Sequence, residues 1–93
     1  MHLKSTTLDS EDCIKIRENV SKGLRIGDDA SHVEPYLNSL GYKANYMDGL
    51  NAYSSTIFIK KYLLGEEHYV SIYIQIKENK IVSIKVSDVN RFL

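Results

Sequence analysis

The stretch YVSIYIQIKENKIVSIKVS, residues 69–87, determines the fold class of this chain. Apolar and polar residues alternate strictly in two segments, and the apolar members are Val70, Ile72, Ile74 and Ile76, then Val82, Ile84 and Val86. A turn at Glu78-Asn79 separates the segments. Strict alternation around a tight turn is typical of an antiparallel hairpin with one buried face and one wet face. We therefore predict such a hairpin here.

The residues before this hairpin also follow strand patterns. Residues 42–47 alternate weakly and end at Asp48-Gly49, which is a strong turn signal. Residues 52–64 form a longer strand pattern, and Gly65-Glu66-Glu67 supplies the next turn. The C-terminal half is therefore predicted to be a four-stranded antiparallel meander.

The N-terminal half carries a helical period instead. Cys13, Ile16, Val20 and Leu24 recur at steps of three and four residues, as on one stripe of a helix. Ser10 or Asp9 is the expected N-cap. Gly23 occupies the position where a left-handed residue commonly ends a helix. This predicts a first helix from about Ser10 to Lys22.

A second helix is predicted from the stripe of Val33, Leu37 and Leu40, with Gly41 closing it. Because a proline deep inside a helix clashes with the preceding turn, Pro35 requires a start just before it. Residues 31–34 read as a capping box that begins at Ser31. A start at residues 28–29 would leave Pro35 too far inside, so we expect the helix to begin at Ser31 after an irregular turn.

These elements predict an α+β fold with two N-terminal helices packed on one face of the sheet. The chain has 93 residues, too few to divide its apolar side chains between two cores, so residues 9–93 are expected to form one domain. Residues 1–8 are polar without a period and are expected to form a flexible arm. The helices would cover the isoleucine and valine face and leave the other face open.

Composition excludes several classes of function. The formal net charge is zero, which argues against a nucleic-acid binder, because such proteins need excess basic charge. No apolar run is long enough to span a membrane. The single cysteine excludes an internal disulfide and a cysteine-rich metal site, and we expect no metal or cofactor. The sequence leaves the cellular compartment undecided. We expect the periplasm or envelope if the N-terminus replaces that of a processed exported protein, and the cytoplasm otherwise.

Three sets of side chains could carry acid–base or nucleophilic chemistry: His32 with Glu34, His68 with Glu66 and Glu67, and Cys13. His32 is more simply interpreted as a residue in the first turn of a helix, and His68 as a residue at the edge of a turn. Cys13 lies on the apolar stripe of the first helix, where it is best read as a small core residue. We therefore predict no catalytic residues and no enzyme.

Tyrosine is the most informative residue type in the chain. Tyr69 and Tyr73 fall on the polar face of the third strand. Rigid amphipathic rings of this kind dominate protein interfaces, although cross-strand pairing within the sheet is an equal alternative. The predicted partner-binding residues are Tyr69, Tyr73, Phe58, Tyr62, Gln75 and Lys85. The expected partner is another protein, and a homo-oligomer through a sheet edge is a further possibility.

A resemblance to a known family supports this view. The stretch Leu24–Gly27, followed by Val33, Leu37 and Leu40-Gly41, resembles the "I-x-x-G…V…L-G" core of SmpA/OmlA-type small envelope lipoproteins. Residues 78–82 resemble their last hairpin, and the layout is similar to the β-lactamase-inhibitor-protein fold. The resemblance covers roughly residues 20–88, but no lipobox precedes Cys13. It implies a small non-catalytic domain that docks on another protein, in the bacterial cell envelope.

Three functional hypotheses follow. The first is a non-catalytic protein-interaction module that uses the open face of the sheet. The second is an inhibitor or immunity protein that blocks a partner enzyme. The third is a small-ligand-binding domain or enzyme whose pocket lies between helices and sheet, lined by His32, Glu34 or Cys13.

Overall fold

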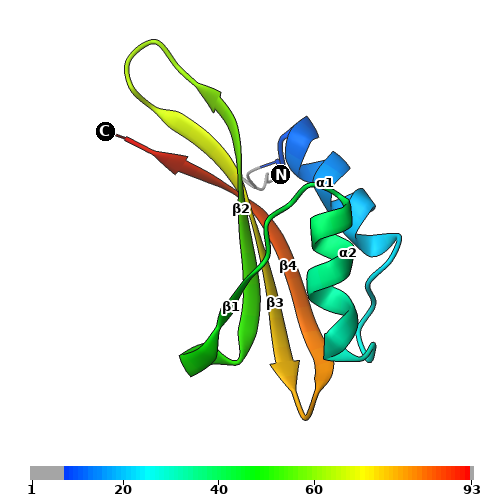
Figure 1. The fold of residues 1–93 in the computed structure, drawn as a ribbon. Helices are drawn as coiled ribbons and strands as arrows, with labels where there is room; N and C mark the ends of the chain where they lie inside the picture. The colour runs from blue at the N-terminus through cyan, green and yellow to red at the C-terminus, as the bar shows by residue number, and fades with distance from the viewer. Residues whose placement is uncertain (1–7, 93) are drawn as a thin grey trace, which may run out of the picture.

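The structure, a computed structural model, describes residues 8–92 and has the predicted order of two helices followed by four strands (Figure 1). The elements are α1 (Glu11–Ser21), the 3₁₀ turn η1 (Ala30–His32), α2 (Val33–Ser39), β1 (Asn45–Met47), the 3₁₀ turn η2 (Asp48–Leu50), β2 (Ala52–Lys61), β3 (Glu67–Lys77) and β4 (Lys80–Arg91). The predicted arm lies outside the described residues, except for the exposed Leu8. Within residues 8–92, no helix has the length and apolar character needed to cross a bilayer.

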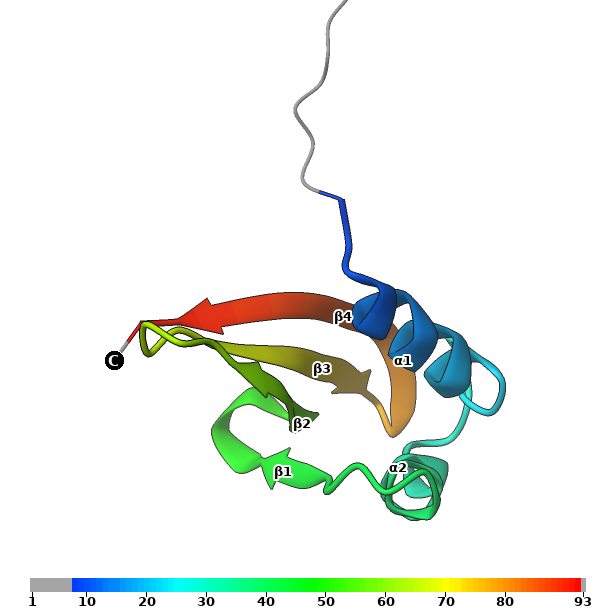
Figure 2. The same cartoon turned by 90° about the horizontal axis from the view of Figure 1, so that it is seen from above.

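The sheet is an antiparallel meander in the order β1-β2-β3-β4, and both helices lie on one of its faces. This confirms the predicted α+β class. Figures 1 and 2 also show that the helices stand over the half of the sheet near the β3–β4 turn. The β2–β3 hairpin and the end of β4 extend beyond the helices. In the described part of the chain, one half of the sheet is therefore without helix cover on either face.

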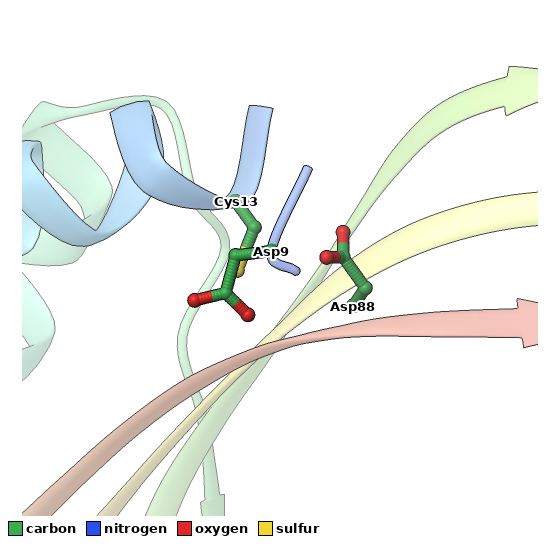
Figure 3. A group of neighbouring side chains, drawn as sticks. All are labelled: Asp9, Cys13 and Asp88. Carbon is green, nitrogen blue, oxygen red and sulfur yellow. The ribbon is translucent and has the colours of Figure 1, made fainter. Parts of the chain in front are cut away.

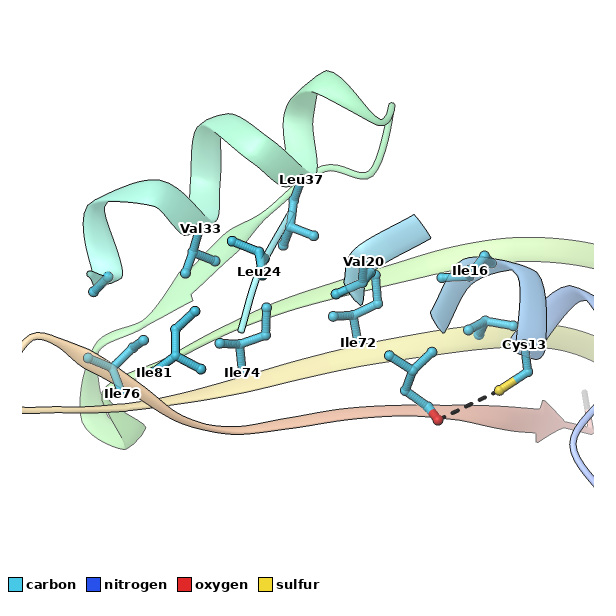
Figure 4. Packing of buried hydrophobic residues seen from close by; sticks show 13 residues of the cluster. Cys13, Ile16, Val20, Leu24, Val33, Leu37, Ile72, Ile74, Ile76 and Ile81 are labelled. Atoms are coloured by element: carbon cyan, nitrogen blue, oxygen red, sulfur yellow. Dashed lines mark hydrogen bonds between the residues drawn. The ribbon is translucent and has the colours of Figure 1, made fainter. Parts of the chain in front are cut away.

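The core forms where the two helical stripes meet the isoleucine and valine face of β3 and β4 (Figure 4). Its most buried members, each at most 6% exposed, are Cys13, Ile16, Val20, Leu24, Ala30, Val33, Leu37, Val70, Ile72, Ile74, Ile76, Ile81 and Val86. Burial of this apolar surface is the main favourable term that holds helices to sheet. The predicted cover of the hairpin by the helices is confirmed, and Leu24 joins the core from the connector after α1 rather than from the helix.

The prediction that Val82 faces the core is wrong. The pairing of β3 with β4 shifts between Gln75 and Ile76, where a β-bulge inserts an extra residue. Because side chains alternate with a period of two, one inserted residue exchanges the two faces. Ile81 is fully buried as a result, whereas Val82 is 43% exposed.

The role predicted for Gly23 is also wrong. Gly23 does not adopt a positive φ, whereas Gly41, at the end of α2, has the expected left-handed conformation with a φ of 86°. Gly23 is needed for space instead. A Cβ atom there would lie 2.3 Å from two carbons of the Tyr36 ring. The helix α2 packs so closely on the end of α1 that only glycine fits.

The second helix begins at Val33, and the capping box predicted at Ser31 does not form. The carboxylate of Asp29 accepts a hydrogen bond from the Ser31 backbone N–H at 2.9 Å, so Asp29 caps η1. The residue before α2, His32, makes no side-chain cap. Pro35 is the third residue of α2, where a backbone N–H has no intrahelical acceptor, so its missing donor costs little.

The outer edge of β4 is partly occupied by the chain itself. The Gly27 N–H donates to the Ile81 carbonyl at 2.8 Å, and the Ile81 N–H donates to the Asp28 carbonyl at 2.9 Å. Farther along, the Arg17 guanidinium donates to the Val86 carbonyl at 2.7 Å. The opposite edge, β1, has three residues. Because β1 pairs only with the first three residues of β2, the outer edge of residues 55–61 has no partner strand among the described residues, and edge pairing between two copies of the chain stays a prediction.

Candidate interaction face and a buried polar cluster

Five of the six predicted partner-binding residues share the open face of the sheet. The register places Phe58 opposite Tyr69 and Tyr73 opposite Lys85. Gln75 lies two residues beyond Tyr73 and therefore on the same face. The open face thus carries one band of aromatic and polar side chains across β2, β3 and β4.

Within this band, the ring of Tyr69 is held from three sides. Its centroid lies 5.5 Å from that of Phe58 in an edge-to-face arrangement, and the Arg91 guanidinium lies 5.0 Å from the same centroid. The Tyr69 hydroxyl donates to a Glu67 carboxylate oxygen at 2.7 Å, and this hydrogen bond raises the pKa of Tyr69. A ring positioned in this way loses little freedom on binding, which favours an interface role.

Tyr73 is held in a similar way farther along β3. Its hydroxyl donates to the Gln75 side-chain oxygen at 3.1 Å, and the Gln75 amide donates to the Leu50 carbonyl at 2.8 Å. Tyr69 and Tyr73 are both half-buried. Part of the tyrosine surface is therefore used in cross-strand packing, and the other part stays accessible.

Tyr62 does not belong to this face, so its predicted place is wrong. The pairing of β2 with β3 shifts between Phe58 and Lys60, and this bulge reverses the alternation. Tyr62 lines a shallow hollow of about 250 Å³ on the other side, together with Leu8, Ser10, His68, Asp88 and Asn90.

The hollow borders a polar cluster that sequence reasoning missed. One oxygen of the Asp88 carboxylate lies 2.6 Å from the Ser10 hydroxyl and 2.6 Å from His68 Nε2. The other oxygen accepts from the Ser10 backbone N–H at 2.9 Å. Ser10 itself caps α1 by accepting from the Cys13 N–H at 3.0 Å. The cluster therefore ties the start of α1 to β3 and β4.

The sequence groups His68 with Glu66 and Glu67, but the structure pairs His68 with Asp88 instead. A signal for its burial existed, because His68 is in phase with Val70 and Ile72 on the core side of β3. No sequence signal links it to Asp88, twenty residues away. His32 and Glu34 are exposed on η1 and α2, and the space between helices and sheet beneath them is filled by the core.

The order of groups in this cluster differs from that of a hydrolase triad. In a triad, histidine lies between serine and the acid and takes the serine proton. Here the Asp88 carboxylate lies between Ser10 and His68. Burial alone would raise the pKa of Asp88, but the hydrogen bonds from Ser10 and His68 hold that pKa below its ordinary value. An ionised Asp88 accepts all three hydrogen bonds, as a structural tie requires.

Asp9, Cys13 and Asp88 bring three possible metal-ligand atoms within 4.8 Å of one another (Figure 3). The Arg17 guanidinium already supplies the positive charge there, since it lies 2.7 Å from Asp9 and 3.6 Å from the Cys13 sulfur. Burial raises the pKa of the Cys13 thiol, and the Asp88 carboxylate raises it further. The Arg17 guanidinium lowers the same pKa, but by less, so the thiol stays protonated, and a protonated thiol is a poor metal ligand and a poor nucleophile.

The lowered pKa of Asp88 predicts acid sensitivity. A carboxyl whose folded pKa lies below its unfolded value of about 3.9 stabilises the fold above that value. This contribution is lost as the pH falls through the folded pKa, so stability should drop below about pH 4. Urea unfolding at several acidic pH values would measure it. The Asp88→Asn variant, which cannot ionise, should show a shallower decline, and an identical decline would contradict the assignment.

Comparison with protein-family models, with curated proteins and with solved structures finds no match for this chain.

Proposed function

We propose that this domain is a non-catalytic protein-interaction module that binds its partner through the open face of the sheet. The observation that carries the proposal is the band of Phe58, Tyr69 and Tyr73, which no helix within residues 8–92 covers. The Arg91 and Lys85 side chains border the rings. Aromatic rings with arginine beside them are the side chains that contribute most at protein interfaces.

Two features support a protein partner over other ligands. The rings are positioned before binding, which reduces the entropy lost on association. The zero net charge gives no general attraction to nucleic acid. The resemblance to SmpA/OmlA-type domains implies the same class of function, and we include docking in the bacterial cell envelope in the proposal.

The Tyr69→Ala/Tyr73→Ala double variant should lose the partner. Affinity capture from a lysate of the source organism, read by mass spectrometry, would compare it with wild-type protein. A central aromatic anchor is worth about 2 kcal/mol or more, which is about thirtyfold in affinity, so loss of both anchors should weaken binding of the captured partner by up to about a thousandfold. Isothermal titration with the purified partner would measure this loss.

The matched control is the Tyr46→Ala/Tyr62→Ala double variant. These tyrosines are 48% and 41% exposed and lie away from the open face, since Tyr46 packs on Tyr53 and Tyr62 lines the hollow. The control should retain the partner. If the Tyr69/Tyr73 variant is folded and binds as tightly as wild type, the face assignment is wrong.

A further inference from the structure

The β2–β3 turn ends in an exposed apolar tip that the proposed binding face does not use. Leu63 and Leu64 are 99% and 96% exposed, and Tyr62 beside them is 41% exposed. Because Glu67 pairs with Arg91, the 79% exposed Phe92 lies next to this turn. We call Tyr62, Leu63, Leu64 and Phe92 the distal tip. Exposed apolar residues scattered singly mean little, but a group at one end marks an interaction site.

The tip projects away from the rest of the molecule. Figures 1 and 2 show the β2–β3 turn and the end of β4 beyond the helices, so a broad flat surface can reach both without meeting α1 or α2. Two backbone hydrogen bonds close the turn: the Tyr62 N–H donates to the Glu66 carbonyl at 2.7 Å, and the Gly65 N–H to the Tyr62 carbonyl at 3.0 Å. Paired backbone groups lower the cost of entering an apolar medium.

The side chains behind the tip are those that suit a membrane interface. Lys60 and Lys61 precede Tyr62, and the Lys60 ammonium lies 5.0 Å from the centre of the Tyr62 ring. Tyrosine and lysine place apolar parts toward the bilayer and polar ends in water. The charges of Lys60, Lys61 and Arg91 are nearly balanced by Glu66 and Glu67. Electrostatic attraction to anionic headgroups therefore contributes less to membrane binding than burial of the apolar side chains does.

The size and shape of the tip favour a lipid surface over a protein. A stable protein interface buries about 800 Å² on each partner. The four side chains of the tip fall short of that area, even at the 150–250 Å² or so that a whole aromatic residue buries, because Tyr62 is only 41% exposed and Phe92 79% exposed. A convex tip also needs a matching cavity in a protein, whereas lipid adapts to it. Partition into a bilayer has no minimum area and increases with the apolar surface buried.

We infer that the distal tip inserts into the surface of a lipid bilayer, driven by Leu63, Leu64 and Phe92. The insertion is peripheral and independent of the anionic lipid content. It leaves the open face of the sheet accessible from the side, so it goes beyond the proposed protein-binding function. The chain would bind its partner while held at a membrane surface.

The test uses the full chain and vesicles of zwitterionic phosphatidylcholine. Wild-type protein should float with the vesicles, and the Leu63→Ser/Leu64→Ser variant should bind about tenfold more weakly or worse. Both leucines are almost fully exposed, so the variant should fold normally. The matched control, Ile26→Ser/Leu50→Ser, alters side chains 63% and 53% exposed at the other end of the molecule and should bind like wild type.

A fluorescent reporter gives a second measurement, because the chain has no tryptophan. The emission of a Leu64→Trp variant should shift to shorter wavelength on addition of vesicles, whereas that of Leu50→Trp should not. Lack of vesicle binding by wild type, or equal binding by the Leu63/Leu64 variant, would overturn the inference. Binding only to anionic vesicles at low salt would do the same. So would self-association through the tip without lipid binding.

Discussion

Replacement of Asp88 by alanine should lower the free energy of unfolding by about 2–3 kcal/mol. The side chain is 21% exposed, and its two oxygens accept from the Ser10 hydroxyl, the Ser10 N–H and His68. The variant leaves the His68 side chain, which is 10% exposed, and the start of α1 without their partner. Donors that lose a charged acceptor in a partly buried site account for the size of the effect.

The Asp9→Ala variant is the control for Asp88→Ala. Asp9 also contacts α1, through a 2.7 Å ion pair with Arg17, but its side chain is 42% exposed. An exposed ion pair is worth less than about 1 kcal/mol. Urea unfolding of both variants at neutral pH would compare the two losses. If Asp88→Ala cost no more than Asp9→Ala, the cluster would not be the tie between α1 and the sheet.

Replacement of Gly23 by alanine should destabilise the fold by about 1–3 kcal/mol. The new Cβ would lie 2.3 Å from ring carbons of Tyr36, so the ring must move. Its displacement would break the hydrogen bond from the Tyr36 hydroxyl to the Asn19 carbonyl, which is 2.7 Å long. The end of α1 would then separate from α2.

A double-mutant cycle identifies the cause of this loss. Gly23 has no positive φ, so on conformational grounds alone alanine would stabilise the chain by about 0.4–1 kcal/mol. In a Tyr36→Ala background, where the clash is absent, Gly23→Ala should therefore be neutral or stabilising. Thermal or urea unfolding of the four proteins would show the change of sign. An equal loss in both backgrounds would point to the backbone conformation instead.

The alternation of apolar and polar residues predicts most of the side chains that share the open face of the sheet. Tyr69, Tyr73, Gln75, Lys85 and Phe58 share the open face because each strand keeps its period of two between bulges. Tyr62 was placed wrongly because the bulge after Phe58 reverses that period. A bulge leaves little trace in a single sequence, since it depends on how the partner strand is paired.

The sequence by itself determined the element order, the α+β class and the stripes that form the core, and it narrowed the N-cap of α1 to Ser10 or Asp9. These features depend on local capping and on periodic burial, which neighbouring residues encode. Only the tertiary structure decided the pairing of Asp88 with Ser10 and His68, the need for glycine at position 23 and the approach of Phe92 to the β2–β3 turn. Each of these joins residues far apart in the chain, and their approach depends on how helices and strands pack.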